Sequence, residues 1–531
     1  MLKRFYILMA LVSVAGSIGC HGTEGAEEAV SFQCHVPQAA PYPDGIPYVG
    51  VHAGPGNNDF VDCDTAPNFT QAWHALRGAA VVQPNTFSPD GGITYVTSSQ
   101  PTADACTVWA LRTEDGSVAW CRAFDEHTLW SAVEVDADGK LYFTTGTAIV
   151  SLNADGTDRW TAATPEGSDP LRKNGAVGLH FTPSGQVVTV TDQGDVLLFD
   201  RESGAIVARL NVPQEFGYNL PPMVMGGALT ELLPDLIKDD FQSVQMGEPG
   251  TLLATFSGAG NFSDNTIAVA PDGTCYVIGG DGSDGALFQV KTVIEDGVVG
   301  LEAGWRMHTK QGSASSPAVS PDGRFVKVSD GNGTAGLLNP RGAGALSRIA
   351  NIGECNANED SDPDPMVCGE SYQVPLLTGP TFGTTPLLNG AVHYQYEIQV
   401  ADLLNTEDPD VRAFDKDTLL WETHLPDGMQ WTSVITVTRN HLIGTGTRFT
   451  DSGDSILSIV ELPGTAESEL VILNRDDGSL AYRAPVSDDS TATVTVGPDG
   501  SLYVTMFALM HIFSLDTRPV AGVIRFAPRA L

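Results

Sequence analysis

The stretch ALRTEDGSVAW at residues 110–120 and the stretch SLNADGTDRW at residues 151–160 share one pattern. Each runs from a leucine in second place through an acidic turn to a glycine, and a tryptophan follows four residues after that glycine. The segment FDKDTLLW at residues 414–421 keeps this spacing with Asp417 in the place of the glycine, and weaker copies lie at 199–208 and 473–482. A pattern that recurs along a chain in this way indicates a repeat architecture.

A second part of the repeat is a Pro-Asp-Gly-like turn between two apolar segments. Proline presets φ, aspartate bonds its own backbone, and glycine accepts the positive φ that a tight hairpin needs. The copies are Ser88–Gly91, Asp136–Gly139, Thr182–Gly185, Ala270–Gly273, Ser320–Gly323 and Gly497–Gly500, with degenerate ones at Leu388–Gly390 and Arg439–Asn440. They predict eight groups of antiparallel strands, or seven if the turn near Asn440 belongs to an insertion in its neighbour.

Taken together, these segments closely resemble the repeat of the PQQ-like propeller superfamily over about residues 80–528. A four-stranded blade cannot bury its own apolar faces, so blades stack around an axis and ring closure protects their edges. We therefore expect an all-β, eight-bladed β-propeller of four-stranded antiparallel blades with loop and short helical insertions. The resemblance also implies that Trp120, Trp160 and Trp421 pack between neighbouring blades and do not stack on a ligand.

The chain divides into three segments: a signal peptide at 1–19, a tether and Pro-rich segment at 20–79, and the propeller at 80–531. Insertions are expected near 214–264 and 350–380. The first has leucines at helical spacing interrupted by Pro234, which predicts a lid over one blade, with a partner contact as the alternative. The second has alternating carboxylates, but Pro365 stands where a calcium loop needs glycine, so no metal is expected there.

The first twenty residues, MLKRFYILMALVSVAGSIGC, have the basic start, apolar run and small residues of an export signal. Their end resembles a bacterial lipobox in which Cys20 is lipidated, although Ser17 replaces the usual leucine. We expect an exported, membrane-anchored lipoprotein, facing the periplasm or at the cell surface, and a secreted protein if Cys20 is not lipidated. Loss of residues 1–19 shifts the net charge from −37 to −39, which repels nucleic acid and anionic lipid. Membrane attachment is therefore expected through the N-terminal lipid alone.

Seven further cysteines would lie in an oxidising compartment, where disulfides persist. A turn centred on residues 114–116 would place two of them opposite each other on paired strands, and two others bracket one acidic loop. The predicted pairs are Cys106 with Cys121, Cys355 with Cys368, and the remaining Cys34 with Cys63. Cys275 lies in an apolar strand and is expected as a buried free thiol.

No catalytic pattern stands out in the chain. There is no GxSxG, no HExxH and no phosphate loop, and the GxGxxG strings at 280–285 and 331–336 join strand-like runs. The resemblance includes quinoprotein dehydrogenases, which hold PQQ over calcium and often carry adjacent cysteines; no two cysteines are adjacent here. We therefore expect no cofactor, no metal and no catalytic residue. The predicted function is a non-catalytic cell-envelope lipoprotein that binds a protein or surface polymer, and the alternative is a PQQ-dependent dehydrogenase.

Overall fold

The computed structural model describes most of the chain. The described residues are 32–98, 105–124, 131–170, 174–221, 261–263, 266–281, 285–309, 316–330, 346–351, 371–375, 392–393, 396–400, 411–415, 418–449, 466–490, 492–507 and 520–529. Within these ranges, no helix has the length and apolar character needed to cross a membrane.

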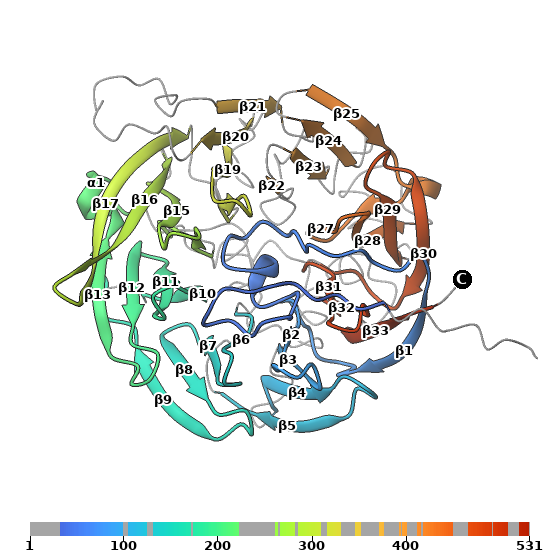
Figure 1. Ribbon diagram of the computed structural model, residues 1–531, viewed down its shortest axis with the longest axis horizontal. Coiled ribbons are helices and arrows are strands. Elements are labelled where there is room, and N and C mark those ends of the chain that lie inside the picture. The colour runs from blue at the N-terminus through green and yellow to red at the C-terminus, as the bar shows by residue number, and fades with distance from the viewer. Residues whose placement is uncertain are drawn as a thin grey trace, which may run out of the picture.

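The described strands form eight antiparallel sheets arranged side by side around a central axis (Figure 1). The first four sheets along the chain are β2 (Thr86–Phe87), β3 (Ile93–Thr97), β4 (Val108–Arg112) and β5 (Val118–Arg122); β6 (Glu134–Val135), β7 (Leu141–Thr144), β8 (Ala148–Leu152) and β9 (Asp158–Ala163); β10 (Ala176–Phe181), β11 (Val187–Thr191), β12 (Asp195–Phe199) and β13 (Ile206–Asn211); and β14 (Ala268–Val269), β15 (Cys275–Gly280), β16 (Gly285–Glu295) and β17 (Val298–Thr309).

The other four sheets complete the ring. They are β18 (Ala318–Val319), β19 (Phe325–Asp330), β20 (Leu346–Asn351) and β21 (Ser371–Pro375); β22 (Val392–His393), β23 (Tyr396–Val400), β24 (Val411–Asp415) and β25 (Thr418–Thr423); β26 (Gln430–Trp431), β27 (Thr436–Val437), β28 (His441–Phe449), β29 (Ala466–Asn474) and β30 (Leu480–Val486); and β31 (Thr495–Val496), β32 (Leu502–Met506), β33 (Gly522–Pro528) and β1 (Phe69–Ala75). The described helices are short: η1 (Val51–Ala53), α1 (Val212–Phe216) and η5 (Pro426–Gly428). The all-β propeller is therefore confirmed; seven of the described sheets have the four strands that the sequence predicted, and the sheet of β26–β30 has five.

The ring is closed by the two ends of the propeller sequence. Strand β1 comes before all the others in the chain, yet it pairs with β33 and forms the outermost strand of the last sheet. The expected start of the propeller at residue 80 is therefore too late, because the closing strand begins at Phe69. Pairing the first strand with the last one ties both ends of the ring into one ladder and removes a ring opening.

The predicted turns connect the first two strands of their sheets. In all six clear copies the glycine has a positive φ, between +69° at Gly91 and +93° at Gly185. In the first copy Asp90 Oδ1 accepts a hydrogen bond from the amide of Gly92, at 3.0 Å. The turn at Asn440 joins β27 and β28 in a sheet of its own, while Leu388–Gly390 lies outside the described residues.

Tyrosine and tryptophan rings recur at matching positions in four sheets. Each pair joins a tyrosine in the second strand from the axis to a tryptophan in the outermost strand of the same sheet. The pairs are Tyr95 with Trp120, Tyr142 with Trp160, Tyr276 with Trp305, and Tyr503 with Trp73. The four tyrosines are fully buried. Ring centroids 5.7 to 6.0 Å apart are within the range of favourable aromatic contacts.

Four tryptophans of outermost strands, Trp73, Trp120, Trp160 and Trp421, also contact the next sheet in the ring. The indole Nε1 of Trp120 donates to Ala154 O at 2.9 Å, that of Trp160 to Arg201 O at 3.0 Å, and that of Trp421 to Arg475 O at 3.0 Å. Each ring lies against the turn glycine of that next sheet, where a Cβ would collide with the indole; these glycines are Gly156, Gly204 and Gly478. Trp73 makes the same contacts with Thr113 O and Gly116. The repeated glycine thus receives the tryptophan of the preceding sheet.

Two predicted disulfides are confirmed. Cys34 and Cys63 are bonded with an S–S distance of 2.07 Å, and Cys106 and Cys121 with 1.97 Å. Cys275 is a buried free thiol, and burial raises its pKa to about 12. The predicted pair Cys355–Cys368 and the lipidation residue Cys20 lie outside the described residues. The same holds for residues 222–260 of the first insertion, so the predicted lid stays a prediction.

Candidate functional site

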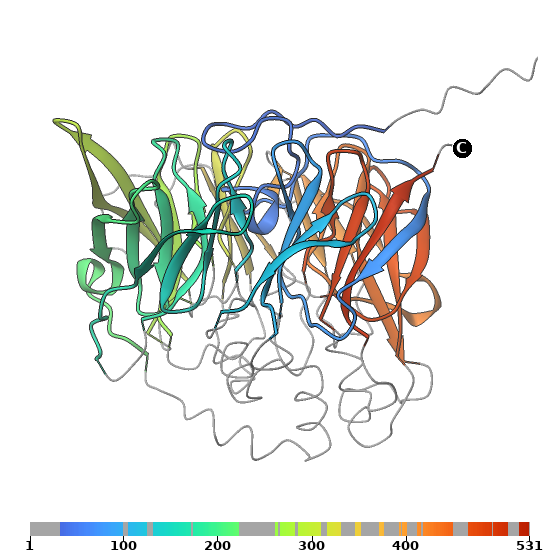
Figure 2. The ribbon, with the colours of Figure 1, turned by 90° about the horizontal axis from the view of Figure 1, so that it is seen from below.

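Residues 32–68, which we call the axial cap, cross one end of the ring. Figure 2 shows this segment along the edge of the propeller that carries the first hairpin turns, and in Figure 1 the short helix η1 lies at the centre of the ring. The cap therefore occupies the axis at this end. The sequence predicted a tether and a Pro-rich segment here, and it gave no indication that the segment covers the axis.

Backbone hydrogen bonds fix the cap to the innermost strands. Val319 N–H of β18 donates to Gly56 O at 2.6 Å, and Val269 N–H of β14 donates to Pro55 O at 2.6 Å. On β27, Val437 N–H donates to Asp59 O and Val437 O accepts from the amide of Val61, both at 2.8 Å. The cap thus supplies backbone partners to strands of three different sheets, which would otherwise need another partner for these groups.

The disulfide pins the two ends of the cap together. Cys34 N–H donates to Pro498 O, and Arg439 N–H donates to Cys63 O. Pro498 precedes β32 and Arg439 follows β27, so the bonded cysteines sit on two different sheets. The loop between the cysteines therefore spans the axial end of the ring and is held at its base.

Beneath the cap lies a buried polar cluster, which we call the axial cluster. His180 of β10 places Nε2 2.8 Å from Asn57 Oδ1 and Nδ1 3.2 Å from Glu134 Oε1 of β6. Asn57 Nδ2 donates to Thr266 O and Ile267 O, so its Oδ1 is the atom that faces the histidine. Nε2 of His180 must then carry the proton, and Nδ1 presents a lone pair to Glu134.

Although the two atoms lie 3.2 Å apart, neither Nδ1 of His180 nor the two oxygens of Glu134 make a hydrogen bond in the structure. A protonated carboxyl at Glu134 is the form that can donate to the lone pair on Nδ1. The pKa shifts agree with it. Burial raises the pKa of Glu134 well above its usual value, against smaller opposing effects of Tyr42 and the amide of Val51. Burial also lowers the pKa of His180 to about 3, with His52 adding to the effect. Burial thus favours the neutral form of both groups in the folded protein.

A second cap pair lies beside the axial cluster. His52 Nδ1 is 3.0 Å from Asp59 Oδ2, and the carboxyl of Asp59 is buried. Burial raises the pKa of Asp59, and the neighbouring His52 opposes that rise. Asn57 and Asp59 of the cap are thus paired with histidines of the protein, while both oxygens of Glu134 and Nδ1 of His180 are buried without a hydrogen-bond partner.

Glu134→Gln is expected to become more stable relative to the unsubstituted protein as the pH rises. The glutamine amide can donate to His180 Nδ1 without taking up a proton. Since the pKa of Glu134 is raised on folding, the folded protein keeps a proton that the unfolded chain releases above about pH 4.5. The free energy of unfolding of the unsubstituted protein therefore falls with pH above this value, by up to about 1.4 kcal/mol per pH unit.

Urea titrations from pH 4.5 to 8 measure this difference. His180 is present in both proteins, so its own titration cancels in the comparison. Glu134→Leu is the control of similar size that neither titrates nor donates, and it should be less stable than Glu134→Gln throughout the range because it offers Nδ1 no donor. A difference between Glu134→Gln and the unsubstituted protein that does not change with pH would contradict a protonated Glu134.

A PQQ ring held over calcium on the axis, which the resemblance implies for a dehydrogenase, does not fit at the capped end. Gly50 is so close to Glu134 that a Cβ on this glycine would collide with the carboxyl group. The side chains of Asn57 and His180 fill the adjacent space and are bonded to each other. Among the described residues, no three or more His, Cys, Asp or Glu side chains are grouped as a metal site.

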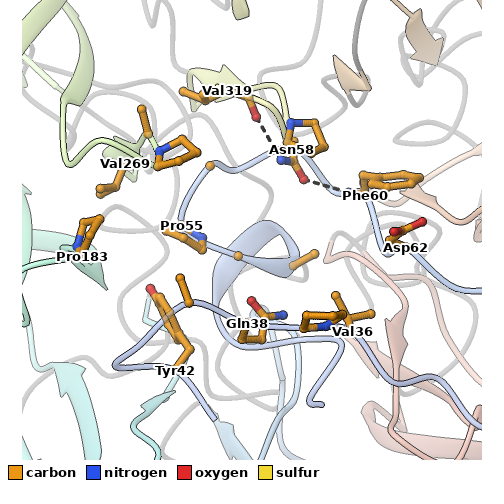
Figure 3. A pocket seen from close by; sticks show the side chains of 18 of the residues that line it. Val36, Gln38, Tyr42, Pro55, Asn58, Phe60, Asp62, Pro183, Val269 and Val319 are labelled. Atoms are coloured by element: carbon orange, nitrogen blue, oxygen red, sulfur yellow. Dashed lines mark hydrogen bonds between the residues drawn. The ribbon is translucent and has the colours of Figure 1, made fainter. Parts of the chain in front are cut away.

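Outside the cluster, the cap and the hairpin turns enclose an open hollow of about 440 Å³ (Figure 3). One side of the hollow is lined by the exposed prolines of three consecutive hairpin turns, Pro183, Pro271 and Pro321. The cap contributes the opposite side, including Val36, Pro37, Ala39, Phe60 and Asp62. The hollow is thus mainly apolar and opens on the same face as the cap.

Its two amide side chains are already engaged within the protein. Gln38 Nε2 donates to Ile46 O at 2.8 Å, and Asn58 Nδ2 donates to Val319 O at 2.9 Å. Asn58 Oδ1 accepts from the amide of Phe60. The hollow therefore offers apolar contact surface and few uncommitted hydrogen-bonding groups.

The family model described as outer membrane protein assembly factor BamB, of the PQQ_2 type, matches residues 61–226. The fold is that of a β-propeller, and residues 61–226 match the PQQ-like repeat of this family model. This propeller is similar to the quinohemoprotein alcohol dehydrogenase from Comamonas testosteroni, with 13% identity, a TM-score of 0.52, and coverage of 92% of this chain and 81% of that chain.

It is also similar to BamB from Moraxella catarrhalis, with 14% identity, a TM-score of 0.47, and coverage of 86% of this chain and 99% of that chain. At these identities the likeness shows the propeller fold alone. No curated protein sequence matches this propeller.

Proposed function

We propose that this propeller is a non-catalytic lipoprotein of the cell envelope that uses its surface to bind a partner. The observation that carries the proposal is the axial cap. It covers one axial end of the ring with buried side chains, of which Asn57 and His180 are hydrogen-bonded to each other, and it leaves an apolar hollow on the outer face. A rigid ring that presents a shaped surface is suited to docking.

The N-terminal features support a place in the envelope. The sequence before Cys20 has the parts of an export signal, and the cysteine is placed for lipidation. The bonds Cys34–Cys63 and Cys106–Cys121 are of the kind that persists in an oxidising compartment. The match to a family model named for an outer membrane protein assembly factor favours a protein as the partner over a surface polymer.

Replacing Cys20 by serine is expected to leave the protein uncleaved or to release it from the membrane fraction, because a single lipid-modified residue carries the attachment. Fractionation of cells followed by immunoblotting measures both outcomes. Ser17→Leu, which restores the usual lipobox residue, is the matched control and should remain in the membrane fraction. A Cys20→Ser protein that is cleaved and fractionates as before would refute the anchor.

The second candidate function is that of a PQQ-dependent dehydrogenase, which the similarity in fold to a quinohemoprotein alcohol dehydrogenase favours. A dehydrogenase of this kind needs room on the axis for the cofactor, and the packing of Gly50 against Glu134 opposes such room at the capped end. We therefore place the binding function first.

A further inference from the structure

A two-stranded ribbon stands out from the ring on the face that carries the cap. Strand β16 pairs with β15 only as far as Val290, while its residues 291–295 continue as a ladder with β17 alone among the described strands. In Figure 2 the ribbon rises at the edge of the ring on the same side as the axial cap. A two-stranded ribbon by itself is marginally stable in water, so additional contacts would stabilise it.

Large apolar side chains are exposed at the tip of this ribbon. Ile294 is 60% exposed and Val298 is 69% exposed, the highest values among the large apolar side chains of the described residues. These two residues lie within two positions of the tip turn at residues 296–297. Exposed apolar groups concentrated at a projecting tip are typical of interaction surfaces.

The ribbon and the hollow belong to one continuous surface. Thr292 Oγ1 in the ribbon donates to Gly273 O at 2.9 Å. Gly273 closes the turn whose Pro271 lines the hollow. The base of the ribbon therefore lies beside the turn that lines the hollow, while its tip projects from the outer edge of the ring (Figure 2). We call the hollow and the ribbon together the cap-face surface.

Acidic groups surround the cap-face surface. Glu295, Asp296 and Glu302 are exposed on the ribbon, with Lys291 as the basic residue there. Beside the hollow, Asp272 is exposed as well. The nearby guanidinium groups of Arg324 and Arg439 are paired with Asp322 and Asp62, at 2.5 and 2.7 Å. The local charge thus has the same sign as the net charge of −37 for the whole chain.

We propose that the cap-face surface binds an extended, basic and apolar segment of a partner protein. An apolar side chain of that segment fills the hollow, a second one packs on the ribbon tip, and flanking Lys or Arg side chains face the carboxylates. This inference rests on the proposed binding function and names the class of partner. Anionic lipid is disfavoured by the surrounding acids, and a glycan by the committed amides of Gln38 and Asn58.

The test uses the mature protein with its disulfides and three fluorescent twelve-residue peptides, measured by anisotropy. The first alternates Lys and Leu, the second Glu and Leu, and the third Lys and Ser. We expect binding of the Lys-Leu peptide only, and binding that weakens with added salt. Equal binding of the Glu-Leu or Lys-Ser peptide, or no binding of the Lys-Leu peptide, would overturn the inference.

Two variants assign that binding to this surface. Ala39→Trp fills the hollow, and Ile294→Ser removes the apolar group of the ribbon tip. Each substitution is expected to raise the dissociation constant of the Lys-Leu peptide by about tenfold or more. Val118→Ser is the matched control, since Val118 is 46% exposed on the outer strand β5 of another sheet. It should bind as the unsubstituted protein does. Unchanged affinity in both cap-face variants would overturn the proposal, and so would binding to vesicles of phosphatidylglycerol and phosphatidylethanolamine.

Recovery of the tethered protein from cross-linked intact envelopes separates this inference from the proposed function. If the unsubstituted protein retains a partner and Ala39→Trp loses it, both stand. If Ala39→Trp retains the same partner, the cap-face inference fails and the binding function remains. If the unsubstituted protein retains no partner, the binding function itself fails.

Discussion

Replacing Cys34 and Cys63 together by serine should lower the free energy of unfolding by about 3–4 kcal/mol. The bond closes a loop with a sequence separation of 29, and the chain-entropy model gives this amount for a loop of that length. In the folded protein the bond also holds the two ends of the axial cap against different sheets. Its loss is therefore expected to release the cap locally before the ring unfolds.

Denaturant titration measures the stability, and hydrogen exchange measures the release of the cap. The amides of Val61, Val269 and Val319 form hydrogen bonds between cap and inner strands, so they should lose protection in the double variant. Replacing Cys106 and Cys121 by serine is the control, because this bond lies away from the cap and should leave these amides protected. Equal protection of the cap amides without Cys34 and Cys63, with the free energy of unfolding changed by less than about 1 kcal/mol, would contradict the view that this disulfide holds the cap in place.

Trp160→Ala is the second large effect that we expect, a loss of about 3 kcal/mol in the free energy of unfolding. The indole packs against Tyr142 of its own sheet and against Gly204 of the next one, and its Nε1 donates to Arg201 O. Truncation leaves a void between two sheets and removes a donor. Because each sheet is held in place by its neighbours, such a void weakens the ring as a whole.

A further substitution of Trp160 separates ring contact from hydrogen bonding, and a substitution at an exposed position is the control. Trp160→Phe keeps most of the ring contact and loses the hydrogen bond, which should cost about 1 kcal/mol. Val207→Ala on the outer strand β13, where the side chain is exposed, should change stability by less than about 0.5 kcal/mol. Urea titration of the four proteins tests the order. A loss below about 1 kcal/mol for Trp160→Ala would contradict docking between the sheets.

Features with a local cause could be predicted from the sequence. The hairpin turns depend on Pro, Asp and Gly within four residues, and the structure has positive φ at the glycine of each clear copy. The pair Cys106–Cys121 follows from two strands joined by a short turn. The fold class could therefore be predicted, because the patterns that indicate it lie within short stretches of the sequence.

The closing strand β1 was missed although its sequence holds a signal. Gln71-Ala72-Trp73 is similar to Val118-Ala119-Trp120, and Trp73 contacts Gly116 as Trp120 contacts Gly156. The segment has no Pro-Asp-Gly turn before it, because the first three strands of its sheet lie at the other end of the chain. The repeat pattern alone therefore placed the start of the propeller at residue 80.

The axial cluster could not be predicted because its contacts join distant parts of the chain. Asn57 lies 123 residues before His180 and more than 200 residues before the carbonyls that its amide contacts. A histidine in a strand carries no local mark of such a partner. The hollow likewise arises from three turns and the cap, and no single segment encodes it.

Incubation of the purified mature protein with PQQ and calcium, followed by equilibrium dialysis and an assay of alcohol- or sugar-dependent dye reduction, tests the central claim most directly. For a non-catalytic binding protein we expect no stoichiometric uptake of PQQ and no turnover, since protein side chains fill the capped end of the axis. Tight binding of one PQQ per chain with substrate-dependent dye reduction would contradict a non-catalytic binding protein.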